Sequence, residues 1–439
     1  MTTTTTTTTL ARVASVRLAL AGCVFASAAA PHLAGAQSLA QRIAQAPDGL
    51  VQFTYAARPG VCGNGRSFIS TGDGNFIGSF NGYIGDVSRN GACEPGPVRV
   101  VLNRADRTVI DIDTYVGPPS MAPGAADLGK VSPSDAADYL LSIAARTEGK
   151  PSRDAIFPAT LADGAAIAPA LLAIARDRDR PRETRRSALS ALARDDAGGG
   201  ERMTSALVAI ARDDTDNQDV RKQALSVLSR SERGDGVPAL MELTRAGTDM
   251  WLVREATLSL ARSGDPRSRQ FLRSAAQRED LPEELRVAAL KGIGGSYATS
   301  QDAEFLRGIY PRLTSDQAKE AVISSVTEMG GAESARWLLA LARNADEPIK
   351  LRRRAVQSAA KAGAPAADIV RLYDSANDPQ IKEVLIDAYA SGGDRAGVDK
   401  LLSIAKTEGD RNLRRRAITR LSRSDDPRVK QVLQEIVER

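Results

Sequence analysis

The chain has 439 residues, of which 42% are hydrophobic and only 4% aromatic, and its formal net charge is +5 at pH 7. This length and composition suffice for a large core of aliphatic side chains, as stacked short helices prefer. The small net charge argues against a partner that is recognised mainly through its phosphates.

Residues 1–36 are predicted to be a secretory signal peptide. Arg12 and Arg17 precede an apolar run over residues 18–30, and residues 34–36 have the small-residue pattern of a cleavage site. The apolar run is too short to span a membrane. Cleavage after residue 36 would remove two arginines and no acid, so the net charge would fall from +5 to +3. We therefore expect an exported protein, in a bacterial periplasm or outside the cell.

An alternative fate of the N-terminus is lipidation at Cys23. The sequence Leu20-Ala21-Gly22-Cys23 resembles the lipobox of bacterial lipoproteins, in which the cysteine is acylated. The apolar run between Arg17 and Cys23 has only five residues, which is shorter than the apolar region of most signals. Simple cleavage is therefore favoured over a lipid anchor.

Residues 37–117 are predicted to form a small β-rich module. Residues 51–55 alternate between apolar and polar side chains, and residues 98–102 and 108–116 read as a hairpin joined by residues 103–107. A module of this size is below the length at which a core alone gives comfortable stability. We expect a covalent link to supply the rest.

Cys62 and Cys93 are the two cysteines that follow the predicted signal. An even pair in an exported protein predicts a disulfide. On the chain-entropy account, closing a loop of about thirty residues stabilises the module by roughly 3–4 kcal/mol.

Asp111 and Asp113 lie on the same side of the predicted second hairpin arm. Such a pair could bind a hard cation or act as an acid pair. Aspartates in this arrangement are more often the solvated face of a strand. We therefore predict no metal site here.

A Gly- and Pro-rich stretch follows the module and predicts a linker over residues 118–131. Helical periodicity begins at Ser132, a plausible N-cap ahead of Pro133. Residues 132–439 are predicted to be an α-solenoid. Within it, residues 132–165 would form an N-terminal cap of one helix pair, and residues 426–438 a terminal cap helix.

The solenoid is predicted from a basic residue that recurs every 30 to 36 residues. We call this residue position zero. Mostly apolar residues recur one before it and four and seven after it, with alanine common three after it, which defines one stripe of a helix. A period near 33 residues is typical of stacked helical units. We therefore expect a mainly α fold of about eight to nine helix pairs behind the β module. We call the basic residues at position zero the basic ladder: Arg185, Arg221, Arg254, Arg286, Lys319, Arg352, Lys382 and Arg414.

The units resemble HEAT repeats of the short type found in phycobilisome lyase-like proteins. The resemblance rests on a loop aspartate, an apolar residue followed by Arg or Lys, and Ala-Leu three and four residues later, as in residues 219–225 and 378–382. It covers residues 166–439 and implies a fold more than a function, since the family is mostly scaffolding and only some members are enzymes.

Two interpretations of the basic ladder are open: an anion-binding track along the groove, or an internal structural ladder. Position zero lies in the middle of the apolar stripe, so its stem should face the core. Its head could then reach the loop aspartate or the carbonyls of the preceding unit. The resemblance implies the same internal Asp–Arg ladder. We favour the structural interpretation, because buried charges are normally paired.

Positions +1 and +2 point away from the stripe and are the candidate partner-binding positions. Arg353, Arg354, Arg415 and Arg416 form two basic clusters that could hold an acidic segment of a partner. A solvated helix face explains them equally well.

The only histidine, His32, lies in the predicted signal. Triads, histidine acid–base catalysis and histidine-ligated zinc therefore have no candidate residues in the processed chain. We predict no catalytic residues and no cofactor or metal. The sequence favours an exported, non-catalytic scaffold that binds a protein partner through the solenoid groove. The alternatives are a bilin-lyase-like enzyme that handles a chromophore and, less favoured, a nucleic-acid-binding HEAT-like protein.

Overall fold

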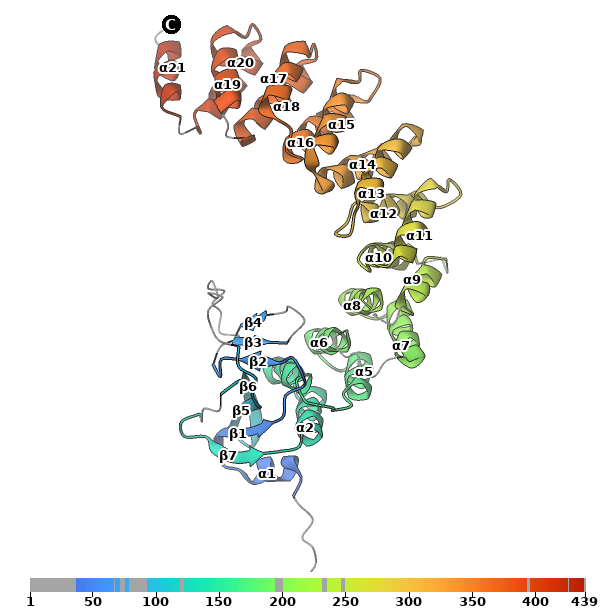
Figure 1. The fold of residues 1–439 in the computed structure, drawn as a ribbon, viewed down its shortest axis with the longest axis vertical. Helices are drawn as coiled ribbons and strands as arrows, with labels where there is room; N and C mark the ends of the chain where they lie inside the picture. The colour runs from blue at the N-terminus through green and yellow to red at the C-terminus, as the bar shows by residue number, and fades with distance from the viewer. Residues whose placement is uncertain are drawn as a thin grey trace, which may run out of the picture.

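The computed structural model describes residues 37–439 except 67, 72–75, 79–92, 119–121, 194–199, 231–234, 246–248, 393–394, 425 and 438–439. The predicted signal peptide, with Cys23 and His32, lies outside the described residues. Figure 1 shows a β-rich module at one end of a curved array of helices. The mainly α solenoid behind a small β module, as predicted, is confirmed.

The larger sheet of the module has the strand order β6-β5-β1-β7. β1 (Gly49–Tyr55) pairs antiparallel with β5 (Val98–Ala105), which in turn pairs antiparallel with β6 (Thr108–Val116). β7 (Ala126–Lys130) pairs parallel with the other edge of β1. The prediction of a linker over residues 118–131 is therefore wrong in its second half. The glycines and prolines mark the turn before β7, and the strand itself carries too little apolar pattern to be seen in the sequence.

The hairpin between β5 and β6 turns more tightly than predicted. Its two connecting residues, Asp106 and Arg107, both have positive φ values, of 50° and 62°. This conformation suits a two-residue turn between twisted strands. The strands therefore extend through most of the segment expected as a loop.

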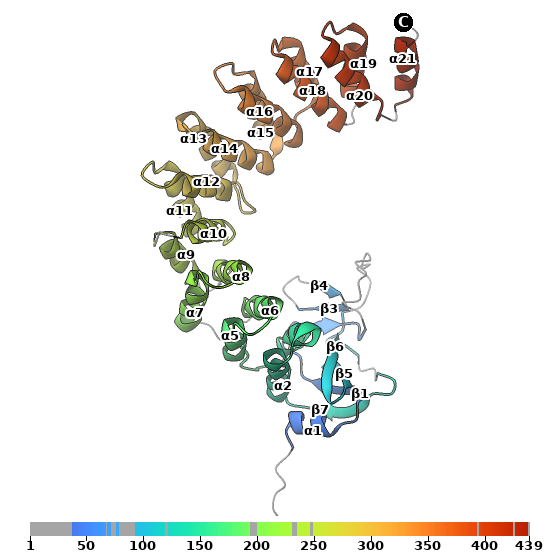
Figure 2. The ribbon, with the colours of Figure 1, turned by 180° about the vertical axis from the view of Figure 1, so that it is seen from behind.

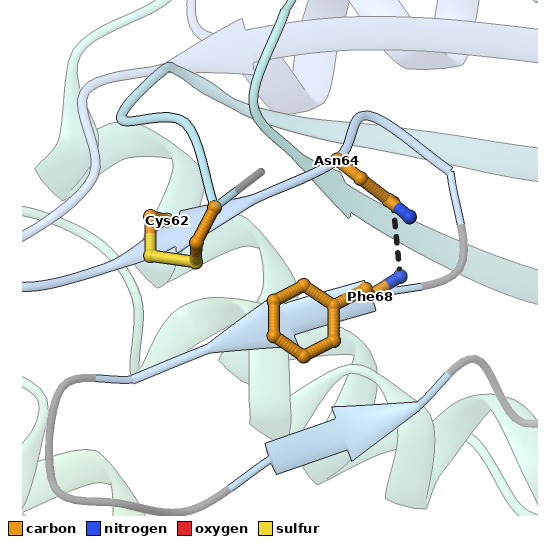
Figure 3. The surroundings of a disulfide bond; sticks show 4 residues. Cys62, Asn64 and Phe68 are labelled. Carbon is orange, nitrogen blue, oxygen red and sulfur yellow. Dashed lines mark hydrogen bonds between the residues drawn. A yellow bond between two sulfur atoms is a disulfide. The ribbon is translucent and has the colours of Figure 1, made fainter. Parts of the chain in front are cut away.

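A smaller antiparallel sheet contains β2 (Cys62–Gly63), β3 (Phe68–Ser70) and β4 (Phe76–Gly78). The predicted Cys62–Cys93 disulfide is confirmed, with a Cα–Cα distance of 5.2 Å (Figure 3). Asn64 accepts a hydrogen bond from the Phe68 amide and shapes the turn between β2 and β3.

The two sheets meet through glycine backbones. Gly117 has a φ of +116°, and a Cβ atom built on it would lie 2.5 Å from the carbonyl oxygen of Gly63. A residue with a side chain therefore cannot occupy this position without moving β2.

Helices join the module to the solenoid without a break. α1 (Leu39–Gln45) begins at the capping box of Ser38, and α2 (Pro133–Arg146) begins at the predicted N-cap Ser132. The predicted second cap helix is divided into α3 (Gly149–Asp154) and α4 (Ile156–Ala159). α3 packs on β6.

Eight helix pairs follow in the part of the chain that the structure describes. The first helices of the pairs, which we call outer helices, are α5 (Ala168–Arg176), α7 (Gly200–Arg212), α9 (Gly236–Arg245), α11 (Pro266–Gln277), α13 (Ser300–Ile309), α15 (Gly331–Arg343), α17 (Ala366–Ser375) and α19 (Arg395–Thr407). The second helices, the inner helices, are α6 (Arg182–Leu192), α8 (Gln218–Ser229), α10 (Met250–Ala261), α12 (Glu283–Ile293), α14 (Asp316–Met329), α16 (Ile349–Lys361), α18 (Pro379–Gly392) and α20 (Arg411–Leu421). A short 3-10 turn, η1 (Tyr310–Arg312), follows α13, and α21 (Pro427–Val437) comes last.

Each inner helix packs directly on the inner helix of the next unit, from α6 through to α20. In Figures 1 and 2 α6, α8 and α10 lie on the side of the curve that faces the β module. The predicted stripe is buried: on α8, Val220, Ala224, Leu225 and Leu228 are at most 1% exposed. The stripe positions of successive helices form one core that continues into the β module.

Candidate functional site: the surface of the inner helices

The basic ladder is most regular in the first two full units. Arg185 donates through Nε to the carbonyl of Ala175 at 2.9 Å, and through Nη1 and Nη2 to both carboxylate oxygens of Asp216 at 2.7 and 2.6 Å. Both side chains are only 5% exposed. Arg221 repeats the pattern with Ala211 and Asp249. These arginines cannot serve as an exposed anion-binding track.

The partners of these arginines do not lie in the preceding unit, as the sequence had suggested. The carbonyl acceptor is at the end of the outer helix of the same unit, and the aspartate lies in the loop of the following unit. Because Arg185 and Arg221 each have a loop aspartate before and after them in the sequence, spacing alone could not decide between the two. Each of these arginine–aspartate contacts therefore ties one unit to the next.

Later ladder residues are also held by neighbouring side chains, but by partners of other types. Lys319 reaches the Glu347 carboxylate at 3.1 Å and lies 5.2 Å from the centre of the Tyr310 ring. Lys382 lies 5.1 Å from the centre of the Tyr373 ring. The repeat pattern did not indicate these aromatic partners, because each comes from the preceding outer-helix segment.

Arg352 donates to the Ala342 carbonyl at 3.2 Å, and Arg414 to the Glu408 carbonyl at 2.7 Å. Two ladder residues depart from the pattern. Arg254 is exposed, and its side-chain contact among the described residues is with the neighbouring Glu255, at 3.3 Å. The Nε of Arg286 is buried and has no hydrogen-bond acceptor among the described residues.

The ladder carboxylates are held in their charged form. Burial opposes ionisation of Asp216, but hydrogen bonds from Arg185 and from the Asn217 amide outweigh it and lower its pKa. Burial likewise opposes ionisation of Asp249, and hydrogen bonds from Arg221 and the Leu252 amide prevail, so its pKa is also lowered. The ladder is therefore an ion-paired structure at neutral pH.

Charged side chains of neighbouring inner helices meet across the helix borders. Arg182 on α6 pairs with Asp219 on α8 at 3.0 Å, and Lys222 on α8 pairs with Glu255 on α10 at 3.3 Å. Arg182, Asp219 and Lys222 are exposed, so these contacts reach the surface of the inner helices, whereas Glu255 is buried. In the N-terminal half of the solenoid, these charges largely cancel.

The four candidate arginines do not behave alike. Among the described residues, Arg353 is exposed and has no acidic partner, and Arg354 donates to the Ser324 hydroxyl at 3.4 Å. Arg415 is also exposed and contacts the side-chain oxygen of Asn412 at 3.3 Å. Arg416 instead is engaged within the fold by an acidic residue of the preceding inner helix.

Asp387 on α18 holds two arginines of α20. It accepts from Arg416 at 2.6 Å and from Arg420 at 2.9 Å. Burial opposes ionisation of Asp387, but the bonds from these two arginines lower its pKa. A hollow of about 600 Å³, which we call the arginine depression, lies on this surface and is lined by Arg415, Arg416, Arg420 and Arg423, together with Glu383, Asn412 and Thr419. Arg420 and Arg423 did not stand out in the sequence, because they lie outside the repeating positions.

The aspartate pair of the β module faces α3. Asp111 is bound by Lys150 at 2.7 Å. Burial and the neighbouring Asp111 carboxylate raise the pKa of Asp113. Within the described ranges, no group of three or more His, Cys, Asp or Glu residues is placed to hold a metal ion. The Lys150 bond makes Asp111 part of the contact between the β module and α3.

No helix among the described residues is both long and apolar enough to cross a membrane.

The repeat pattern and its geometry agree with a family comparison. Residues 204–294 match the model of HEAT repeats. This segment is therefore similar to HEAT repeats. The solenoid extends the same helix pairing on both sides of this segment. Among curated proteins, none matches this chain.

Several solved structures are similar at low identity. A structure of lipovitellin is 12% identical, with a TM-score of 0.44, and the match covers 76% of this chain and 41% of that one. Human deoxyhypusine hydroxylase is 16% identical, with a TM-score of 0.26, over 58% of this chain and 94% of that one. The CpcE–CpcF phycocyanin lyase from Nostoc is 16% identical, with a TM-score of 0.22, over 61% and 94%.

Proposed function

We propose that this protein is an exported, non-catalytic scaffold that binds a protein partner on the surface of its inner helices. The observation that carries the proposal is the continuity of this surface. Consecutive inner helices pack directly on one another, and the ladder residues Arg185, Arg221 and Lys319 are fixed by contacts to the following unit. A solenoid surface of this kind is already formed before the partner binds, so the solenoid loses little conformational entropy on binding.

Arg353, Arg354 and Arg415 are the residues we propose for partner contact, because no acid of the described chain neutralises them. Arg416 is excluded from the charge-reversal test. Its reversal to glutamate would place a third carboxylate beside Asp387 and Glu383, and would disturb the fold as well as the surface.

A photo-crosslinking amino acid tests this proposal directly. It would replace Gln357, an exposed residue of α16 at position +5, the position whose counterparts Ser324 and Asp387 contact the neighbouring inner helices. The matched control carries it at Ala340, which is exposed on the outer helix α15. We expect irradiation of native cells to give one discrete adduct from Gln357 and none from Ala340. Equal adducts at both positions, or none at either, would refute partner binding on the inner helices.

Export is supported by the Cys62–Cys93 disulfide, since such bonds persist in oxidising compartments. The intact mass of the protein from its native cells tests it. We expect a chain that begins at Gln37 and gains two hydrogens on reduction. A full-length chain with reduced cysteines would place the protein in the cytosol, and an acylated Cys23 would make it membrane-tethered.

The chromophore-handling alternative needs an apolar groove, and the exposed apolar side chains do not favour one. The large ones among the described residues are Leu50, Ile110, Met250 and Tyr297, and they belong to separate elements. Absorbance after mixing with bilins would reveal such an activity.

A further inference from the structure

Positive charge on the inner surface is concentrated on two helices. α16 carries Lys350, three consecutive arginines and Lys361, and no acid. α20 carries five arginines in eleven residues and no acid. The helix between them, α18, contributes Glu383 and Asp387. The surface therefore has two basic helices with acidic residues on the helix between them.

The positive charges that are not neutralised are at the two ends of this pattern. On α16, Lys350 and Lys361 pair with Glu320 and Glu328 of α14 at 2.5 and 2.6 Å, while Arg353 has no acidic partner among the described residues. On α20, Asp387 binds Arg416 and Arg420. This leaves Arg415 exposed at one side of the arginine depression, together with Arg423 just after the helix.

Asp387 also gives the depression its rigidity. A single carboxylate receives Arg416 through two nitrogens and Arg420 through one. Two guanidinium groups held in this way lose little conformational freedom when a further anion approaches. Thr419 and Asn412 in the same lining can exchange hydrogen bonds with a peptide backbone.

We propose that the surface from α16 to α20 binds an extended protein segment with two acidic clusters separated by neutral or basic residues. Packed helices lie about 8–10 Å apart, so two steps along the stack measure roughly 16–20 Å. An extended chain advances about 3.3 Å per residue, which places the acidic clusters roughly five or six residues apart. The carboxylates of one cluster would meet Arg353 and Arg354, and those of the other would meet Arg415 and the arginine depression.

The central acids decide against a continuous polyanion. A nucleic acid strand would bring a phosphate over α18 as well as over its neighbours, where Glu383 and Asp387 lie. A peptide can place an uncharged or basic residue there. This inference rests on the proposed function and specifies its ligand.

The test measures binding of fluorescent synthetic peptides to the purified full-length chain by anisotropy. One peptide carries two Glu-Glu pairs six residues apart, and two others have the same composition with the pairs two or twelve residues apart. A poly-glutamate peptide, a single-stranded oligonucleotide and anionic vesicles are the competing anions. We expect the six-residue spacing to bind about tenfold more tightly than the other spacings, because only this spacing lets both acidic pairs meet arginines at the same time.

Two variants and a control locate the site. Arg353→Glu and Arg415→Glu each remove one half of it, and we expect each to weaken the six-residue peptide about tenfold and to abolish the preference for that spacing. Arg336→Glu, on the exposed side of outer helix α15, should change neither. Circular dichroism confirms that each variant is folded.

Equal binding of all spacings, tighter binding of the oligonucleotide or vesicles, or an unchanged preference in Arg415→Glu would overturn the inference. If none of the peptides binds but the adduct at Gln357 still forms, the inference of an acidic ligand is refuted and the proposed scaffold function stands. If that adduct is absent as well, both the acidic ligand and the scaffold function are refuted.

Discussion

Removal of Asp216 provides a direct test of the ladder as a structural tie between units. Asp216→Ala leaves the Arg185 guanidinium buried, at 5% exposure, without its two carboxylate bonds of 2.7 and 2.6 Å. Breaking a buried pair from one side typically costs about 3–5 kcal/mol. The variant also lacks the bond that Asp216 accepts from the Asn217 amide at 2.7 Å, so we expect a destabilisation in the upper part of that range.

The matched control is the Glu328–Lys361 pair, which also joins neighbouring inner helices but is 63% and 65% exposed. Exposed pairs contribute about 0–1 kcal/mol, so Glu328→Ala should have little effect. Replacing both ladder partners, Arg185→Met with Asp216→Ala, should recover part of the stability, because no buried charge is then left unpaired.

A solenoid is stabilised unit by unit, so the destabilisation should be local. Hydrogen exchange read by mass spectrometry should show faster exchange in α6 and α8 and little change in α16 to α20, and urea unfolding should give the free energy of unfolding. If Asp216→Ala and Glu328→Ala differ by less than about 0.5 kcal/mol, the ladder does not tie the units together and the reasoning from burial fails.

Three further predictions concern stability. Reducing the Cys62–Cys93 disulfide, which spans 31 residues, should lower the stability of the β module by about 3–4 kcal/mol; thermal melts with and without reductant measure it, and an unchanged melting temperature would contradict it. The folded-state pKa of Asp216 is lowered, so its contribution to the free energy of unfolding is complete above the unfolded pKa of about 4 and is lost as the pH falls through the folded pKa. In an acid titration followed by circular dichroism, the stability of Asp216→Asn should therefore depend less on pH than that of the unmodified chain. Gly117→Ala should destabilise the module, because its Cβ would lie 2.5 Å from a backbone oxygen and its φ is +116°. Gly124→Ala also has a positive φ, of +75°, but its Cβ meets nothing within 4 Å, so it should cost less stability. Similar melting temperatures for the two variants would show that the backbone of β2 moves to accommodate the added atom.

The sequence by itself determined the solenoid, because its signal is local and repeated. The spacing of Val220, Ala224, Leu225 and Leu228 around Arg221 defines a helix face without reference to the rest of the chain, and these four residues are buried as expected. The disulfide also followed from the sequence, because the chain after its predicted signal holds only two cysteines. Strand β7 escaped prediction, because its place depends on pairing with β1, some seventy-five residues earlier.

Only the tertiary structure decided which charges are neutralised and which are left exposed. Arg415 and Arg416 are neighbours with the same side chain, yet one is exposed and the other is bound by Asp387, twenty-nine residues earlier in the chain. Likewise, Arg185 and Arg254 occupy equivalent positions, but only Arg185 meets an aspartate of the following unit. Period and pattern determine which face a residue occupies. Its partner across the stack is set by loop length and by the packing of neighbouring units, which no single repeat contains.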